Sequence, residues 1–187
     1  MPSGRPPSLH ERPVGVAATA RHYLRDLVYG SIDGVITTFA VVAGVQGGQL
    51  AAAVVLVVGL ANLFADGLSM AAGNYLSIRS NEGARRASGL AEEEAEPARH
   101  AGATFAAFVA AGAVPLLPYL LPVAPDDRFV ASTVLTLGTL AAAGIMRAIV
   151  TGESWVMSVI EMVGLGAAVA VIAYWVGRFV ASIGGAL

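Results

Sequence analysis

The stretch "LANLFADGLSMAAGNYLSIRS" (residues 60–80) is apolar enough to cross a bilayer, yet it carries a polar or sulfur-containing side chain at every fourth position. These residues are Asn62, Asp66, Met70 and Asn74. An α-helix makes slightly more than one turn in four residues, so the four side chains follow one side of a single helix. Because polar groups are costly in hydrocarbon, we expect this stripe to face other helices rather than lipid.

Two further stripes border the polar one. Small residues follow it at Ala61, Ala65, Ser69 and Gly73. Mostly large apolar residues follow it at Leu60, Phe64, Leu68, Ala72 and Leu76. Small residues let helices approach closely in lipid, where packing drives association. We therefore expect the small-residue stripe to be a helix-packing seam and the apolar stripe to face lipid or an apolar partner.

The composition extends this reading to the whole chain. Of 187 residues, 56% are hydrophobic and only 13% are charged, and the mean hydropathy is +0.71. Residues 27–77, 100–123 and 129–150 contain only three charged side chains, Asp33, Asp66 and Arg147. This balance is wrong for a soluble protein and predicts an all-α polytopic membrane protein. The five expected transmembrane helices cover about 27–45, 50–78, 101–121, 129–150 and 155–180.

Local signals refine this topology. Pro115, Pro118 and Pro122 predict a kink or an end in the third helix, because proline lacks the amide donor. Nine arginines lie in the N-terminal tail and on the loops of one side, against two on the other, which places the N-terminus in the cytoplasm. We expect residues 1–22 to be a flexible cytoplasmic tail in which His10 and His22 are solvated. The membrane domain then covers 23–187, with a short cytoplasmic loop at about 79–100.

Several classes of chemistry are disfavoured. Cysteine is absent, which excludes disulfides and thiolate sites. The net charge of -2 gives no reason to expect a nucleic-acid partner. The apolar runs make the lipid bilayer an expected partner, and the oxygen groups inside the spans make metal ions the other. Without cysteine or a histidine inside a span, a dedicated zinc or copper site is less favoured than a site for a harder ion.

The first span repeats the pattern of the second. Asp33 lies several residues inside the membrane boundary, Thr37 follows one turn later, and Gly30 and Gly34 flank the acid at the spacing of a packing seam. An ionisable residue inside a span indicates a functional site. The alternative is structural, with Asn62 and Asn74 joining helices and Asp66 pairing with a neighbour. Oxygen ligands with one thioether favour Fe²⁺ or Mn²⁺ over Ca²⁺ or Na⁺.

Three segments carry a resemblance to a known family. The segments are "YGSIDGVITTFAVVAGVQG" (29–47), "GLANLFADGLSMAAGNYLSIRSNE" (59–82) and, more weakly, "EMVGLGAAVAVIAYWVGRFV" (161–180). The chain resembles the vacuolar iron transporter family, whose members export Fe²⁺ or Mn²⁺ from the cytosol in exchange for protons. The resemblance implies five transmembrane helices, a homodimer with the metal path near its axis, and Asp33 and Met70 as transport ligands.

The chain departs from that family in two ways. Plant and fungal-type members carry a glutamate where this chain has Asn62, and the acid appears here as Asp66 instead. Many members also insert a helical metal-binding domain between the second and third spans, and about 79–99 is too short to form one. The expected metal ligands are Asp33, Asp66, Met70, Asn62, Asn74, Thr37 and Glu82. The expected proton-coupling residues are Asp33, Asp66 and Glu161.

Two groups of acids keep alternative readings. The loop acids and His100 either gather cations at the entrance or form a solvated segment; they are Glu82, Glu92, Glu93, Glu94, Glu96 and His100. Glu161 is either a proton or metal group or a partner for Arg147.

The sequence thus predicts an Fe²⁺ or Mn²⁺ exporter that works by proton antiport, with the ion as substrate and no resident cofactor. We expect it in a bacterial plasma (inner) membrane. Desolvation favours the protonated form of an embedded acid and a bound dication favours the ionised form, so metal and protons should compete at Asp33 and Asp66. The alternatives are a membrane-embedded metal-dependent enzyme and a structural membrane subunit. Neither a His-Glu-x-x-His pattern nor a phosphate-binding glycine loop supports an enzyme.

Overall fold

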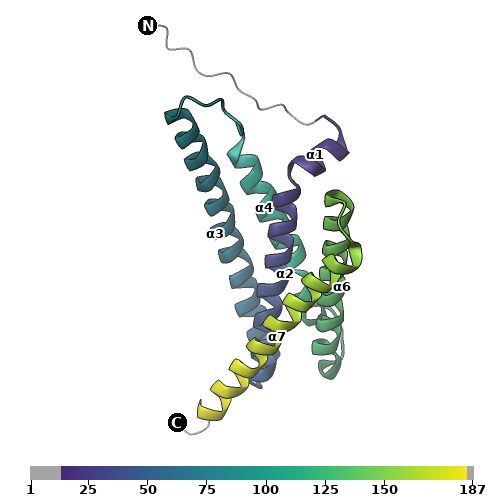
Figure 1. The fold of residues 1–187 in the computed structure, drawn as a ribbon. Helices are drawn as coiled ribbons and strands as arrows, with labels where there is room; N and C mark the ends of the chain where they lie inside the picture. The colour runs from purple at the N-terminus through teal and green to yellow at the C-terminus, as the bar shows by residue number, and fades with distance from the viewer. Residues whose placement is uncertain (1–13, 185–187) are drawn as a thin grey trace.

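The computed structural model describes residues 14–184, which form a bundle of helices with short connections (Figure 1). The long helices are α2 (Leu24–Gly47), α3 (Ala52–Ala87), α4 (Pro97–Gly112), α6 (Arg128–Thr151) and α7 (Trp155–Gly184). The short elements are α1 (Val16–His22), η1 (Val114–Leu116), α5 (Leu117–Leu120) and η2 (Pro125–Asp127). The prediction of an all-α membrane fold is confirmed.

Five segments of the described chain are long and apolar enough to cross a membrane, as predicted. They are Leu24–Gly47, Ala52–Ala87, Pro97–Leu120, Pro125–Thr151 and Trp155–Gly184. Successive spans run in opposite directions, so α1 and the C-terminal end of α7 lie at opposite ends of the bundle (Figure 1). We call the end that holds α1 and the α3–α4 loop the entrance end.

α3 is longer than the sequence predicted. Its 36 residues make a helix about 54 Å long, whereas a hydrocarbon core is about 30 Å thick. The C-terminal turns of α3 extend past α2 at the entrance end (Figure 1). The tail was expected to be flexible through residue 22, but residues 16–22 form α1. Residues 1–13, including His10, lie outside the described residues.

Glycines bring α2 close to two neighbouring helices. A Cβ at Gly30 would lie 2.5 Å from the carbonyl oxygen of Thr104, and one at Gly34 would collide with the carbonyl oxygen of Phe108. Both pairs are spaced by four residues, which fixes the register of α2 against α4. One turn nearer the entrance, the same register places Asp26 beside His100.

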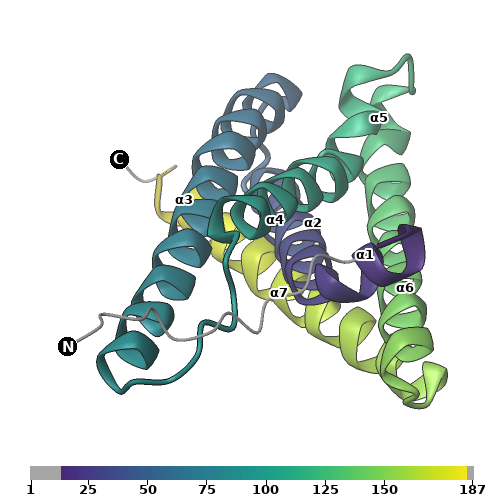
Figure 2. The same cartoon turned by 90° about the horizontal axis from the view of Figure 1, so that it is seen from above.

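α7 crosses α2 near the end opposite the entrance, at an angle that is clear from above (Figure 2). A Cβ at Gly47 would collide with the carbonyl oxygen of Tyr174, and one at Gly177 would collide with that of Gly44. Backbone therefore meets backbone at this crossing. Much of the rest of α7 is exposed and apolar, as expected of a lipid-facing helix.

The packing face of α3 differs from the predicted one. Its buried residues are Val55, Gly59, Leu63, Gly67, Ile78 and Glu82. The small-residue stripe from Ala61 to Gly73 is exposed, and a Cβ at Gly73 would meet nothing within 4 Å. Inside one chain the seam prediction is wrong. The reason is that Gly67 receives the rings of Phe105 and Phe108 instead.

The proline cluster interrupts the third span as predicted. α4 ends at Gly112, and the chain continues through η1 and α5 before it turns. Pro115 and Pro118 are buried at this break. The hydroxyl of Ser132 on α6 donates a 2.7 Å hydrogen bond to the carbonyl of Pro115. A carbonyl beside the helix break is thereby satisfied inside the bundle.

Candidate functional site

The two predicted intramembrane acids lie on the neighbouring helices α2 and α3. Asp33 on α2 and Asp66 on α3 are both partly buried. Like charges on the two carboxylates would disfavour each other. Thr37, one turn from Asp33, donates its hydroxyl hydrogen to the carbonyl oxygen of Asp33 at 2.8 Å. The Thr37 oxygen keeps its lone pairs, so the segment offers acceptor atoms to a cation.

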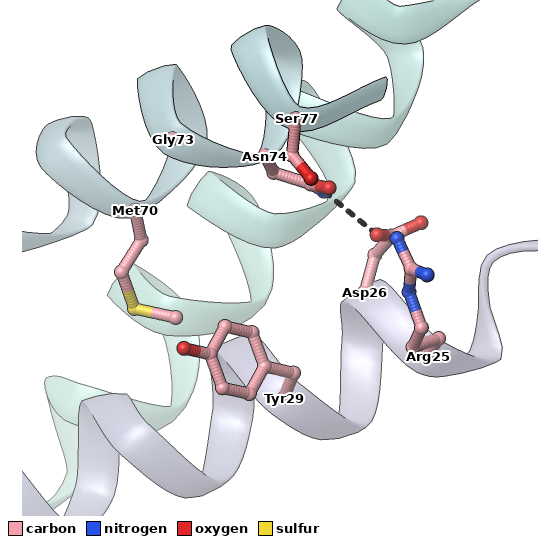
Figure 3. A pocket seen from close by; sticks show the side chains of 7 residues that line it. All are labelled: Arg25, Asp26, Tyr29, Met70, Gly73, Asn74 and Ser77. Atoms are coloured by element: carbon pink, nitrogen blue, oxygen red, sulfur yellow. Dashed lines mark hydrogen bonds between the residues drawn. The ribbon is translucent and has the colours of Figure 1, made fainter. Parts of the chain in front are cut away.

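Met70 lies in a cavity of about 490 Å³ between α2 and α3, near the entrance end (Figure 3). The cavity is lined by Arg25, Asp26, Tyr29, Met70, Gly73, Asn74 and Ser77. The Met70 thioether and the Tyr29 side chain point toward one another across it (Figure 3). Sulfur and phenol oxygen atoms thus border one space, which is a suitable environment for a transition ion but not for a strongly hydrated one.

Asn74 joins three helices, as the structural alternative for the asparagines anticipated. Its Nδ2 atom donates hydrogen bonds to Asp26 Oδ1 at 2.7 Å and to Thr104 Oγ1 at 2.8 Å. Asp26 belongs to α2 and Thr104 to α4, so one amide connects both to α3. Asn62 is partly buried further along α3. The metal-binding roles predicted for both asparagines stay predictions.

The predicted ligands line different cavities. Asp33 borders a second cavity, of about 590 Å³, which also touches Tyr29 and Arg147. Met70 and Asn74 line the first cavity, and Tyr29 and Arg25 line both. The two spaces therefore meet at one turn of α2.

A third cavity, of about 490 Å³, lies at the entrance end. Its polar lining residues are His22, Arg25, Asp26, Ser77, Asn81, Glu82, Glu93, Glu94 and His100. Arg25, Asp26 and Ser77 also line the Met70 cavity, so the entrance space and the Met70 space adjoin. We call this third cavity the vestibule.

Glu82 anchors the α3–α4 loop to α3. Its side chain is buried, and its carboxylate accepts the backbone N–H of Glu94 at 2.9 Å and that of Glu93 at 3.2 Å. A carboxylate that receives backbone donors stabilises a local turn strongly, because charge-assisted hydrogen bonds are short and strong. This structural role was not anticipated, and the role of Glu82 as a metal ligand stays a prediction.

We expect Glu82→Gln to loosen this loop. The neutral amide turns charge-assisted hydrogen bonds into weaker ones and places a donor beside two backbone donors, at a cost of about 1–3 kcal/mol. Hydrogen exchange at the Glu93 and Glu94 amides should accelerate correspondingly. Glu92→Gln is the control, because Glu92 only approaches Arg86 at 3.7 Å. Unchanged exchange in Glu82→Gln would contradict the anchoring role.

His22 and His100 were the least anticipated part of the vestibule. His22 was expected to be solvated, but it is partly buried and its ring lies 5.0 Å from the His100 ring, centroid to centroid. His100 is buried, and its Nδ1 atom lies 2.5 Å from Asp26 Oδ2. Asp26 was not among the predicted site residues. His22 and Asp26 are four residues apart, and so are His100 and Thr104. This spacing of polar residues could have indicated a polar site here.

Glu161 forms the ion pair that was one of its two expected readings. Arg147 on α6 donates to Glu161 Oε2 on α7 at 2.8 Å and to Glu153 Oε2 at 2.9 Å. This exposed group links the ends of two helices. A role for Glu161 in proton coupling stays a prediction.

Comparison with known proteins bears on the identity of this site. A model of the VIT family matches residues 24–91 and 83–178, which include every residue that lines the cavities described above except His22. The chain belongs to the VIT family. The resemblance noted from the sequence motifs is thereby confirmed.

Named relatives within the VIT family include two of similar extent to this chain. Vacuolar iron transporter 2 of Oryza sativa subsp. japonica is 27% identical over 88% of this chain and 90% of its own length. Vacuolar iron transporter 1 of Arabidopsis thaliana is 26% identical over 87% of this chain and 88% of its own. A vacuolar iron transporter of Toxoplasma gondii (strain ATCC 50861 / VEG) is 44% identical over 64 residues, which are 34% of this chain and 21% of that protein.

This chain differs from the rice relative in the segments that it contains. The alignment with the rice protein spans 222 residues, more than the 187 of this chain, so the rice protein contains segments that this chain lacks. The two matched ranges of the family model meet at 83–91, where α3 ends and the loop begins. This is where we expected the additional metal-binding domain of other members to be missing.

Proposed function

We propose that this protein transports a divalent transition-metal ion, Fe²⁺ or Mn²⁺, across a membrane and exports it from the cytoplasm in exchange for protons. The observation that carries the proposal is the placement of Asp33 and Asp66, two partly buried acids inside the spans on the neighbouring helices α2 and α3. Membership of the VIT family and the names of its relatives support iron as a substrate.

The chemistry of coupling follows from the placement of Asp33 and Asp66 inside the spans. Two carboxylates in a poorly solvated space are stabilised either by protons or by a dication. Binding of the metal should therefore displace protons, and protonation should release the metal. A site that alternates between these two loads while opening to each side in turn is an antiporter. Alternating access through a shift of α3 completes the proposal.

The cavities support a route from the entrance end. The vestibule adjoins the Met70 cavity through Arg25, Asp26 and Ser77, and the Met70 cavity adjoins the Asp33 cavity through Tyr29. Arginines are concentrated at the entrance end, which favours a cytoplasmic location for it. The ion would enter at the vestibule, pass Met70 and reach Asp33 and Asp66.

We further propose a homodimer in a bacterial plasma membrane. The small-residue stripe of α3 packs against no helix of its own chain at Gly73. A second copy placed there would bring the polar stripe of each α3 close to the dimer axis, and small residues favour such close packing in lipid. Chemical cross-linking through cysteines introduced at Ala65 and Gly73 would test this arrangement.

Transport into protein-free liposomes tests the function. Purified protein should drive Fe²⁺ and Mn²⁺ uptake when a pH gradient is imposed, and a pH-sensitive dye inside the vesicles should report proton movement in the opposite direction. Metal uptake without proton movement would support metal transport and contradict proton antiport. Correctly inserted protein that moves neither ion would instead favour a membrane-embedded metal-dependent enzyme or a structural subunit.

A further inference from the structure

The vestibule contains a group of side chains with the composition of a metal site. His22 of α1, Glu94 of the α3–α4 loop and His100 of α4 each bring one ligand atom within 4.8 Å of the others. They come from three separate segments of the chain. His100 is buried, with 6% of its surface exposed, and the other two are partly buried. This differs from an acidic surface cluster, because two of its three members are imidazoles and one is fixed inside the protein.

His100 is oriented as a metal-binding histidine. Its Nδ1 atom contacts the carboxylate of Asp26, which itself accepts a hydrogen bond from Asn74. Its Nε2 atom lies 3.0 Å from Glu94 Oε2, without the alignment of a hydrogen bond among residues 14–184. A carboxylate on one ring nitrogen, with the other nitrogen turned toward a second potential ligand, is the arrangement found in carboxylate–histidine–metal groups.

The distances suit a shared ion. His100 Nε2 lies 3.0 Å from Glu94 Oε2, and His22 Nε2 lies 3.8 Å from the same oxygen. Metal–ligand bonds of about 2.0–2.2 Å place neighbouring ligand atoms about 3.0–3.5 Å apart. Small side-chain rotations would bring all three atoms to one ion. Two protonated imidazoles at 5.0 Å would repel, whereas neutral imidazoles are good ligands.

We propose that His22, Glu94 and His100 form a second divalent-metal site at the entrance, positioned by Asp26. Two imidazole nitrogens and one carboxylate are typical of sites for Fe²⁺, Zn²⁺ and related first-row ions, and not of sites for Mg²⁺ or Ca²⁺. The site therefore selects transition ions before they reach the membrane interior. Its role as a loading site rests on the proposed transport function, but its ability to bind metal does not.

The position of Asp26 links this site to the deeper one. Asp26 lines both the vestibule and the Met70 cavity, and Asn74 binds it from the polar stripe of α3. An ion released from His22, Glu94 and His100 would meet Asp26, Asn74 and Met70 next. The proposed site thus stands at the start of the route and shares a supporting residue with it.

Co²⁺ binding to the purified full chain tests the proposal, because bound Co²⁺ absorbs visible light. The titration is made in an Asp66→Asn background, which weakens the transport site and leaves the vestibule unchanged. We expect one Co²⁺ that is not displaced by excess Mg²⁺. His100→Gln and His22→Gln should each weaken it by about 100-fold or more. Asp26→Asn, which removes a supporting carboxylate, should weaken it by about 10- to 100-fold.

Glu92→Gln is the control. It removes a carboxylate from the α3–α4 loop, which also carries Glu94, but Glu92 lies outside the group, so this variant should bind Co²⁺ normally. His22→Gln separates loss of the metal site from misfolding. The His22 side chain is partly exposed, so this variant should elute and unfold as the parent protein does. Unchanged Co²⁺ affinity in both histidine variants, or easy displacement by Mg²⁺, would overturn the site. Metal uptake by the wild type would stand in that case, whereas histidine-dependent binding without uptake would overturn only the transport function.

Discussion

Liposomes containing Asp33→Asn or Asp66→Asn protein are expected to take up Fe²⁺ and Mn²⁺ about 100-fold more slowly than those containing the wild type. Asparagine keeps the size of aspartate but removes the charge that balances a dication in a poorly solvated space. Losing one partner of a desolvated charge pair costs about 2–5 kcal/mol, and about 1.4 kcal/mol corresponds to a tenfold change. Each single variant should therefore be nearly inactive.

The measurement has an internal control in the same protein. Asp127→Asn removes an exposed carboxylate at the end opposite the entrance and should leave uptake unchanged. Asp33→Asn and Asp66→Asn proteins should still elute and unfold as the wild type does, because asparagine keeps the size of aspartate at these partly buried positions. Wild-type rates in both variants would rule out a transport site at these acids. A loss in only one would restrict the site to that helix.

Gly47→Ala is expected to have the largest effect on stability. The added methyl group would collide with the carbonyl oxygen of Tyr174, and the nearby Gly177 already contacts the backbone of Gly44. Backbone atoms cannot rotate away as a flexible side chain can, so α2 and α7 must separate. Overpacking of this kind costs about 1–3 kcal/mol, and we expect about 3 kcal/mol here.

Thermal unfolding in detergent would measure this loss, with Gly138→Ala as the control. A Cβ at Gly138 on α6 would meet nothing within 4 Å, so alanine there should be neutral or slightly stabilising. If Gly47→Ala unfolds at the wild-type temperature, the close crossing of α2 and α7 is incorrect. The same substitution should not alter Co²⁺ binding at the vestibule in protein that remains folded, because the two features lie at opposite ends of α2.

The five spans were predictable because their signals are local. Long runs without charge define a transmembrane helix from composition alone, and Pro115 and Pro118 mark a helix break through the absence of their own amide hydrogens. Asp33 and Asp66 were identified for a similar reason. A charged residue inside an apolar run is unusual whatever the segment packs against, so it can be recognised without knowing the tertiary contacts.

The packing face of α3 was not predictable in the same way. Two stripes of this helix contain small residues, and nothing within residues 60–80 says which one meets a neighbour. The choice is made by Phe105, Phe108 and Leu116, which fill the space beside Gly67 and Gly59. Those bulky residues belong to a later part of the sequence, so tertiary contacts determine which face of α3 is buried.

The vestibule was also beyond a local reading. His22 and His100 are separated in the sequence by all of α2 and α3, and they meet because α2 and α4 are held in one register. In the sequence analysis, His100 and Glu94 belonged to a segment for which gathering of cations was one of two readings. They were not paired with a histidine before the first span, since nothing local relates the two.

The glycine contacts of α2 also bear on which parts of the bundle can move. α2 meets α4 through backbone at Gly34 and Phe108, and a one-turn slip would press the Cβ of Asp26 or Thr38 against a carbonyl that now meets a glycine. α3 meets α4 through the rings of Phe105 and Phe108 at Gly67, and rings can slide and rotate against a flat glycine surface. We expect α2 and α4 to travel as one rigid body. α3, which bears Asp66 and Met70, is then the helix that rocks.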